Sequence, residues 1–396
     1  MAVPLSFSKF TVWGSYDMGK PRVRLLLDAL RKRNMLASEI NIDVWRGIED
    51  KSVAGLMRIA SALIRLIIGY PYALFRFFGT SRVDVILLPY PAIFDIFIIW
   101  PLTRLRGQKI IFDAFISLYD TIINDRKLLR CGDWRARLLW HFERFALRMA
   151  DIVIVDTDEH GRYFAASFDI APEKFVTVLV GAEDLFWEVR DQIAPNEAPA
   201  DVPSPYVLFY GQFIPLHGIE TILHAVELTA SQNIHWLIVG SGQEEDLVRE
   251  FVSRNAPRNM TWLPWVDYRE IPGLIRNAAV CLGIFGDSDK ASRVIPNKMF
   301  QILAAGGTII TRDSPAVTGL ARQCPDNILL VAPADADALA NAMISACSQY
   351  NPASMPFSSV TREALSPDKG VSKLLRRLKQ LRVVGDVSER RASDFA

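Results

Sequence analysis

Residues 285–310 read FGDSDKASRVIPNKMFQILAAGGTII, which combines a polar loop, a helical pattern, two glycines and an apolar run. The spacing of the apolar residues predicts a helix that begins at Pro296 and Asn297, because proline is tolerated in a first turn and asparagine caps helix ends. Gly306 and Gly307 are typical of a helix end, and the apolar residues after them predict a buried strand. This order of elements indicates an α/β protein.

Three cationic side chains, Lys290, Arg293 and Lys298, surround the predicted start of this helix. The first N–H groups of a helix have no partners within it, and the helix dipole adds positive potential there. Such a helix end binds anions, and phosphate or diphosphate is the anion we expect in an α/β protein. A solvated loop between two core elements explains the same residues equally well.

The composition of the 396-residue chain narrows the class of protein. The length predicts two domains, and the near balance of 45 basic and 44 acidic residues argues against nucleic acid as a partner. The four cysteines and five histidines show no metal-ligand spacing, so we expect neither a metal site nor a disulfide framework. Scattered cysteines and the lack of a signal-peptide pattern lead us to expect a cytoplasmic protein.

Alternating strand and helix patterns over residues 1–190 predict a parallel, doubly wound domain. Gly14, Ser15 and Tyr16 follow the first predicted strand, and Asp113 ends a later one. Ligands of such sheets bind at the carboxyl ends of the strands, where a carboxylate can orient or deprotonate a hydroxyl, or simply cap the next segment. We expect strands near residues 10–13, 83–91, 109–113, 151–156 and 175–179, and helices near 22–33, 94–106, 134–149 and 157–168.

Residues 189–205 contain four prolines and no apolar periodicity, which predicts a linker. A second α/β domain is expected over residues 204–365. Residues 370–383 predict a basic amphipathic helix, and a polar, mobile tail is expected after Gly385. Within the second domain we expect strands near residues 206–210, 235–239, 260–263, 280–285, 308–311 and 328–331, and helices near 219–229, 244–255, 271–277 and 336–348.

Residues 52–79 are strongly apolar but contain Arg58, Arg65 and Arg76. A membrane-spanning helix needs about 20 apolar residues, and an arginine near its centre costs about 3 kcal/mol, so we predict no spanning helix here. Pro71 interrupts the apolar run past its middle. Two interpretations remain open, a basic helix lying in the membrane interface and a core helix whose arginines extend into water.

Residues 294–310, VIPNKMFQILAAGGTII, resemble the nucleotide-sugar motif of the retaining glycosyltransferases of family 4 (group 1). These enzymes have the GT-B fold, two facing Rossmann-like domains with a cleft between them. The family motif carries two glutamates eight positions apart, and Arg293 and Gln301 occupy those positions here. The second glutamate holds the ribose in the family, so the resemblance implies that Gln301 makes this contact as an amide. Arg293 is expected to bind phosphate instead.

A second loop, GQFIPLHGIETI at residues 211–222, strengthens the resemblance. An arginine and a lysine of the family clasp the diphosphate from this loop, and Gln212 and His217 stand in their places. We predict that the three cations of the later stretch compensate for this loss. The resemblance implies these donor-binding residues: Gly211, Gln212, His217, Gly240, Gly242, Lys290, Asn297 and Gln301.

The resemblance implies a hexosyltransferase that moves a sugar from a nucleotide-diphosphate donor to an acceptor hydroxyl with retention. No metal or other cofactor is expected, since the cations can carry the leaving diphosphate. The expected partners are the nucleotide sugar and a saccharide or lipid-linked acceptor, in bacterial envelope polysaccharide or glycolipid synthesis, with peripheral membrane contact through residues 52–79 at the inner face of the plasma membrane. The final segment, residues 366–396, is expected to cross back to the first domain. The expected catalytic residues are Asp113, Arg293 and Lys298, and the expected acceptor-side residues are Gly14, Ser15 and Tyr16.

Three other functions remain open from the sequence. Because both motif glutamates are replaced, a catalytically inactive GT-B scaffold fits the same pattern. A nucleotide-sugar epimerase shares the fold but needs an acid/base pair, for which we find no convincing candidates. A protein that acts mainly by binding a membrane surface would depend on residues 52–79.

Overall fold

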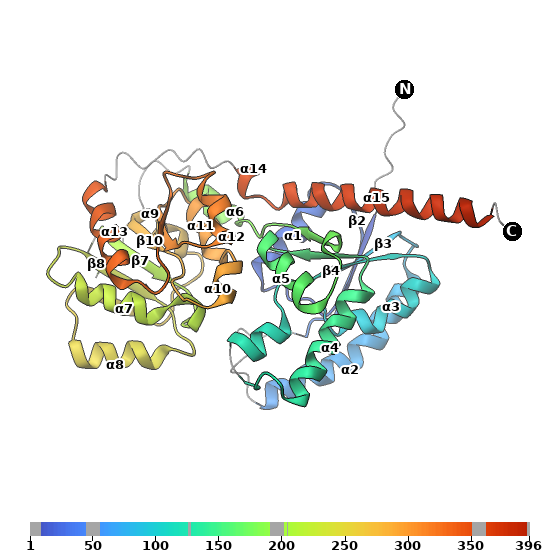
Figure 1. The fold of residues 1–396 in the computed structure, drawn as a ribbon, viewed down its shortest axis with the longest axis horizontal. Helices are drawn as coiled ribbons and strands as arrows, with labels where there is room; N and C mark the ends of the chain where they lie inside the picture. Colours follow the sequence, from blue (N-terminus) through green and yellow to red (C-terminus); the bar gives the residue numbers. More distant parts are fainter. Residues whose placement is uncertain are drawn as a thin grey trace, which may run out of the picture. The chain divides into compact units, whose positions relative to one another are not determined.

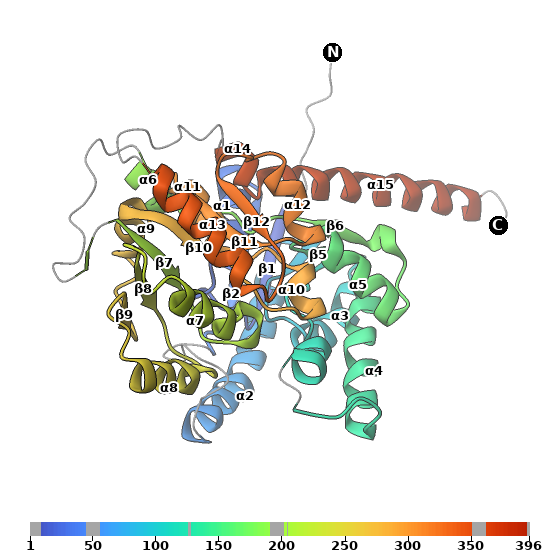
Figure 2. The ribbon, with the colours of Figure 1, turned by 60° about the vertical axis from the view of Figure 1, so that its left-hand side comes forward.

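The structure is a computed structural model of the chain, and it describes residues 9–44, 56–125, 128–190, 202–203, 205–350 and 362–393. The predicted linker therefore lies mostly outside the described residues. The chain divides into two compact units, drawn in Figures 1 and 2. Unit 1 comprises Met1–Val180 and Pro367–Ala396, and unit 2 comprises Gly181–Ser366.

Unit 1 contains a six-stranded parallel sheet in the order β2-β1-β3-β4-β5-β6. Because β1 lies between β2 and β3, the winding direction reverses there, and the carboxyl ends of β1 and β3 form the topological switch point. The strands are β1 (Phe10–Gly14), β2 (Leu36–Asn41), β3 (Val85–Leu88), β4 (Lys109–Asp113), β5 (Ile152–Val155) and β6 (Phe175–Thr177). The helices include α1 (Pro21–Lys32), α2 (Leu56–Gly79), α3 (Asp95–Leu105), α4 (Trp134–Met149) and α5 (Asp158–Phe168).

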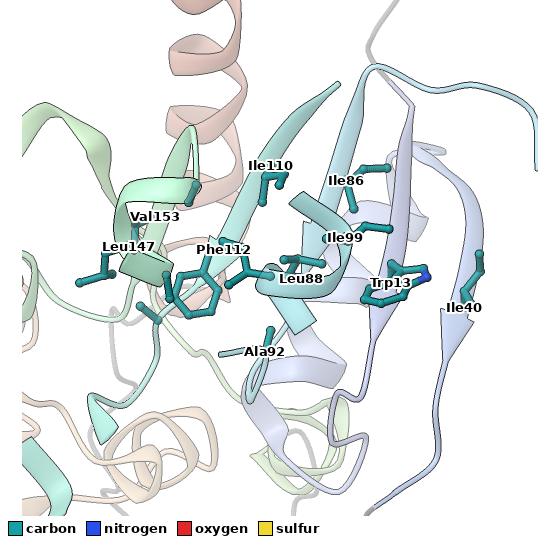
Figure 3. Packing of buried hydrophobic residues seen from close by; sticks show 14 of the residues in the cluster. Trp13, Ile40, Ile86, Leu88, Ala92, Ile99, Ile110, Phe112, Leu147 and Val153 are labelled. Carbon is teal, nitrogen blue, oxygen red and sulfur yellow. The ribbon is translucent and has the colours of Figure 1, made fainter. Parts of the chain in front are cut away.

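One face of this sheet is covered by α2, α3 and α4, whose apolar residues share a core with the strands. Figure 3 shows this core around Trp13, Phe112 and Val153, which project from three different strands. The Trp13 indole N–H donates to the Ala73 carbonyl of α2 at 3.3 Å. The near-continuous apolar composition of the central strands is what burial on both faces requires.

Pro71 lies inside α2, and the helix continues through it to Gly79. Proline removes one backbone donor and crowds the preceding turn, which costs about 3 kcal/mol in a helix interior. Core contacts on both sides of Pro71 offset this cost. Tyr70 stacks on Trp13 with ring centroids 6.0 Å apart, and Phe77 is fully buried.

The opposite face of the sheet is covered by α1 and by the last helix, α15 (Asp368–Ser393). Val371, Leu374 and Leu378 of α15 are buried there. A Cβ atom on Gly370 would lie 2.5 Å from the Val178 Cα, so only glycine permits this approach. The helix belongs to unit 1 although it follows unit 2 in sequence, and it extends past residue 385, where we expected a mobile tail.

Unit 2 contains a second six-stranded parallel sheet, in the order β12-β11-β10-β7-β8-β9. Its switch point lies between β7 and β10, the neighbours at which the winding reverses. The strands are β7 (Tyr206–Tyr210), β8 (His235–Val239), β9 (Met260–Leu263), β10 (Ala278–Leu282), β11 (Ile309–Arg312) and β12 (Ile328–Val331). The helices include α6 (Asp184–Arg190), α7 (Ile219–Leu228), α8 (Glu245–Asn255), α9 (Ile271–Asn277), α10 (Asp289–Arg293), α11 (Asn297–Ala304), α12 (Pro315–Ala321), α13 (Ala336–Gln349) and α14 (Arg362–Leu365).

The boundary between the units differs from the one expected at residue 190, because residues 181–190 belong to unit 2. Helix α6 packs against α9 and α11. Phe186 of α6 lies edge-on to Tyr268, with ring centroids 5.8 Å apart, and the Tyr268 hydroxyl donates to Glu183 at 2.9 Å. These contacts explain why the segment joins unit 2.

Two buried carboxyl groups, those of Asp95 and Glu143, should make the stability of unit 1 depend on pH. Asp95 accepts hydrogen bonds from the Ser15 backbone and the Tyr70 hydroxyl, both at 2.8 Å, while burial raises its pKa to about 6. Burial also raises the pKa of Glu143 to about 7, against hydrogen bonds from the 117–119 turn. The folded state therefore retains protons between about pH 4 and pH 7 that the unfolded chain releases.

We expect the free energy of unfolding of unit 1 to decrease as the pH rises through this window, by on the order of 3 kcal/mol per group. Urea unfolding followed at several pH values measures the slope. Asp95→Asn keeps an acceptor for Ser15 but does not titrate, so it should flatten the slope. An unchanged slope in this variant would show that Asp95 does not titrate in the window.

Candidate functional site

The candidate site of unit 2 lies at the switch point between β7 and β10, where the loops after both strands meet the start of α11. Gly211 follows β7 and Gly283 follows β10. Lys298 is the second residue of α11, and its amine donates to the Gly283 carbonyl at 3.0 Å. A Cβ atom on Gly211 would lie 3.5 Å from the same Nζ atom. The ammonium group of Lys298 is thus positioned between the ends of the two central strands.

The environment of Lys298 is mostly apolar, since the residue is only 5% exposed. Its Nζ atom lies 3.9 Å from the centre of the Phe209 ring, a cation–π contact. Burial holds the pKa of the Lys298 amine well below its ordinary value. An anion brought to this amine would oppose that shift, because a nearby negative charge favours the protonated form.

His217 lies beside Lys298 and is buried as well. Its Nδ1 atom donates to the Gln212 backbone carbonyl, so the Nε2 atom is the acceptor of a neutral imidazole. Burial and the neighbouring Lys298 hold the pKa of His217 well below its ordinary value. His217 therefore does not supply positive charge, whereas the Gln212 side chain is exposed at the loop surface.

Glycines hold the loops after β7 and β8 against each other. Gly240 has φ 151°, and a Cβ atom there would lie 2.0 Å from the Gly211 carbonyl oxygen. Gly242 has φ 149°, and its Cβ atom would lie 2.8 Å from the Phe213 carbonyl oxygen. Side chains at either position would push the Gly211 loop away from Lys298, so the predicted Gly-x-Gly pair has a packing role here.

Gln301 is the centre of a buried hydrogen-bond chain. Its Oε1 atom accepts from the Tyr210 hydroxyl at 3.1 Å, and its Nε2 atom donates to the Tyr268 hydroxyl at 2.8 Å. The Tyr268 hydroxyl in turn donates a hydrogen bond to Glu183. An amide fits this chain because it both accepts and donates, whereas a carboxylate would meet the Tyr268 oxygen without a donor. The ribose contact of Gln301 stays a prediction.

Lys290 and Arg293 lie in α10, a five-residue helix capped by Ser288, whose Oγ atom accepts from the Ala291 backbone. Ala291 packs on Leu216 and so joins α10 to the loop after β7. Both cations are partly exposed. The pattern of residues 285–296 did not predict this helix, because five residues are too few to show a helical period.

The prediction that Asn297 caps α11 is wrong, since Pro296 takes the capping position and Asn297 is the first helical residue. Pro296 makes no side-chain capping hydrogen bond. Arg312, which the sequence analysis missed, is buried at the end of β11 and donates to the Gly286 carbonyl. It fixes the loop that leads into α10, and its position at the carboxyl end of a strand was the available signal.

In unit 1, two of the three predicted acceptor-side residues, Gly14 and Ser15, contact Asp95 at the switch point between β1 and β3. Ser15 donates to Asp95 from both its backbone and its hydroxyl. Gly14 has φ 124°, and a Cβ atom there would lie 2.4 Å from Asp95 Oδ2. Tyr16 is 2% exposed. The structure therefore brings Gly14 and Ser15 to a buried carboxyl group, whereas Tyr16 packs in the apolar core on the α1 side of the sheet.

Asp113 forms an internal ion pair rather than an open carboxylate. Its Oδ1 atom lies 2.9 Å from Arg22 Nη2, and the two side chains are 0% and 1% exposed. Arg22 also donates to the Val178 carbonyl and lies over the Phe115 ring. This arrangement joins α1 to the ends of β4 and β6, and it leaves the carboxylate no open side from which to deprotonate a substrate.

Within the part of the chain that the structure describes, no three His, Cys, Asp or Glu residues lie close enough together to hold a metal ion. Gly211, His217, Gly240 and Lys298 meet at the unit 2 switch point. Gln301 joins them through Tyr210, whose hydroxyl also contacts the Lys298 carbonyl at 3.3 Å. Gly14, Ser15, Tyr16 and Asp113 form the separate sites in unit 1 described above.

The chain is similar to known proteins, in sequence over residues 204–349 and in fold over nearly its whole length. Residues 204–349 match the family model described as Glycosyl transferases group 1. No curated protein sequence matches the chain. HepE from Anabaena in complex with UDP has a similar structure, with a TM-score of 0.58 and 12% identity over 97% of this chain and 100% of that chain.

Two further solved structures are similar. A glycosyltransferase from Rickettsia africae gives a TM-score of 0.52 at 12% identity, covering 96% of this chain and 99% of that chain. TarM from S. aureus gives 0.52 at 12% identity, covering 74% of this chain and 55% of that chain. The predicted fold class is confirmed: the chain has the GT-B fold of two Rossmann-like α/β units, and its residues 204–349 are similar to the group 1 glycosyl transferases.

Proposed function

We propose that this protein transfers a sugar from a nucleotide-diphosphate donor to an acceptor hydroxyl, and that unit 2 binds the donor. The observation that carries the proposal is the position of the Lys298 amine, at the switch point and beside the glycine loop after β7. Nucleotides bind at such points in doubly wound sheets, with phosphates against helix N-termini. The match of residues 204–349 to group 1 glycosyl transferases supports the same assignment.

In the proposed reaction, Lys298 stabilises the negative charge that develops on the departing diphosphate, and Lys290 and Arg293 of α10 add positive charge beside the same loop. Fixed cations in a site of low polarity stabilise such charge strongly, because they need little reorganisation. We propose that these side chains act in place of a metal ion. Retention at the anomeric carbon and transfer of a hexosyl group follow from the family resemblance of residues 294–310.

We further propose a saccharide or lipid-linked acceptor and a role in bacterial envelope polysaccharide or glycolipid synthesis. The structures of similar fold support a sugar nucleotide as the donor class, since HepE is described with UDP-glucose and TarM with UDP and α-GlcNAc-glycerol. In unit 1, Gly14, Ser15 and Tyr16 at the switch point are the proposed acceptor side. Asp113 is not proposed as the base, because it is closed in its ion pair with Arg22.

A thermal-shift panel of UDP, GDP, ADP and their sugar conjugates tests the donor site. A ligand present at about 100 times its dissociation constant adds about 2.7 kcal/mol of stability, which a melting curve resolves. We expect one nucleotide to stabilise the wild-type protein, and the stabilisation to fall to about 0.4–1.4 kcal/mol in Lys298→Met if its affinity drops tenfold to hundredfold. No shift with any nucleotide would contradict the proposal.

A catalytically inactive scaffold is the second candidate, and the closed contacts of Asp113 and Gln301 favour it. Such a protein would bind the nucleotide without turning the donor over. Hydrolysis or transfer of the stabilising nucleotide sugar, followed by release of the free nucleotide, distinguishes the two functions. Release above the rate of the Lys298→Met variant excludes the inactive scaffold.

A further inference from the structure

Helix α2 (Leu56–Gly79) carries apolar side chains on both its inner face, toward the core of unit 1, and its outer face, toward solvent. The inner face packs on the unit 1 core, where Ala73 and Phe77 are 1% exposed. Gly69 lies so close to Ile42 that a Cβ atom would be 2.2 Å from its Cγ2 atom. The Tyr70 hydroxyl is anchored on Asp95. These contacts fix the helix along the surface of unit 1.

From Ser61 on, the outer face of α2 exposes large apolar side chains in each turn. Ile67 is 71% exposed, Ile68 is 68% exposed and Phe75 is 76% exposed. Soluble surfaces normally expose such residues singly, so a continuous row marks a contact with another apolar phase. The residues of this outer face are Leu63, Ile64, Ile67, Ile68, Tyr72, Phe75 and Phe78.

Helix α4 carries a second row of exposed apolar side chains. Trp134, Leu138 and Phe145 are 71%, 63% and 52% exposed, and their spacing places them on one side of the helix. Because α2 and α4 pack on the same core cluster, both outer faces point away from the same side of the sheet (Figures 1 and 2). Tryptophan and tyrosine at such positions are typical of the level of lipid head groups.

The charge of this surface identifies its partner. Residues 56–82 contain four arginines and no acidic residue. Arg65 and Arg76 are exposed on α2, and Arg137 is exposed on α4, whereas the acidic residues within α3 and α4, Asp95 and Glu143, are buried. An apolar strip bordered by arginines fits the surface of an anionic bilayer, where the strip enters the acyl boundary and the guanidinium groups contact phosphates.

We infer that the outer face of α2, together with that of α4, docks unit 1 on an anionic membrane surface. By length and composition alone, Ser61–Gly79 is also long and apolar enough to cross a membrane. The core contacts of Tyr70 and Phe77 decide against crossing, because a spanning helix would have to leave them. The helix lies in the plane of the interface instead.

The docking also relates the membrane to the proposed acceptor side, an argument that rests on the proposed function. Tyr70 on α2 bonds to Asp95, and Asp95 bonds to Ser15 at the end of β1. The Asp95 carboxyl group therefore links the docking helix directly to the proposed acceptor-side loop. A lipid-linked acceptor, whose chain remains in the bilayer, is the acceptor class that this placement favours.

Sedimentation of the full-length protein with vesicles tests the inference. We expect the wild-type protein to bind vesicles of phosphatidylglycerol mixed with phosphatidylcholine, and to bind phosphatidylcholine vesicles much more weakly. The exposed-face variant Ile67→Ser with Phe75→Ser should bind at least about tenfold more weakly, since it removes two large apolar anchors. The variant Arg65→Gln with Arg76→Gln should bind anionic vesicles with an affinity lower by roughly fivefold per arginine, and its binding should depend much less on salt concentration.

Leu247→Ser is the matched control, because Leu247 is an exposed leucine on α8 of unit 2 and should not affect vesicle binding. Wild-type protein that does not bind anionic vesicles would overturn the inference, as would equal binding by the Ile67/Phe75 variant. A change from dimer to monomer in that variant, without vesicle binding, would assign the face to a second copy of the chain. The nucleotide thermal shift, measured on the same variants, tests the donor site independently.

Discussion

Replacing Lys298 with methionine should weaken donor binding by roughly tenfold to a hundredfold, without lowering the stability of unit 2. A charge-assisted hydrogen bond to phosphate contributes about 1.5–3 kcal/mol, and methionine cannot make one. Methionine retains the packing over Phe209. Burial of a lysine costs free energy that methionine does not, so the melting temperature should stay constant or rise. Titration calorimetry with the nucleotide found by the panel measures the affinity.

The same experiment has a pH signature. Burial holds the pKa of the Lys298 amine well below its ordinary value, and a bound diphosphate should raise this pKa, because a nearby negative charge favours the protonated form. Donor affinity should therefore fall as the pH rises through the pKa of the free protein, and Lys298→Met should remove this dependence. Calorimetry in buffers of different ionisation enthalpy measures the proton uptake directly.

Lys174→Met provides the control, since Lys174 is a partly buried lysine of unit 1 whose amine also donates to a backbone carbonyl, that of Arg148 at 2.8 Å. We expect it to bind the donor like the wild-type protein. Unchanged donor affinity in Lys298→Met would exclude Lys298 from the donor site. In that case the cations of α10 would have to bind the diphosphate without it.

Replacing Asp113 with alanine should destabilise unit 1 by about 3–5 kcal/mol, because it leaves the Arg22 guanidinium buried without its counter-ion. Urea unfolding measures this loss when it is monitored by tryptophan fluorescence, to which the buried Trp13 of unit 1 contributes. Nucleotide binding by the folded protein should persist, since the proposed donor site lies in unit 2. The large effect of this single change reflects burial, with the two side chains 0% and 1% exposed.

The double variant Arg22→Met with Asp113→Leu distinguishes a structural from a catalytic role. Replacing both charges with apolar groups of similar size removes the unpaired charge, so the double variant should be more stable than Asp113→Ala. If Asp113→Ala instead keeps the wild-type stability and loses sugar transfer, the expectation that Asp113 acts on the acceptor hydroxyl is right, and the ion pair opens during the reaction.

Much of the fold followed from local patterns. The apolar runs of β7, β8 and β9 and the period of α4 were predicted with the bounds that the structure has. Strand β2, with the polar sequence LASEIN, was not predicted, because an edge strand lacks the continuous apolar run of a buried one. Pro71 does not end α2, since tertiary packing offsets its local cost.

The sequence by itself determined two α/β units and gathered three cations at the start of α11, because periodicity and turn residues are local properties. Only the tertiary structure decided which charges are buried. Lys298 lies under the Gly211 loop, and Asp113 is paired with Arg22 from a segment 91 residues away. Desolvation depends on neighbours that distant segments supply, so no local pattern could show that one candidate forms an ion pair while another lies at the switch point.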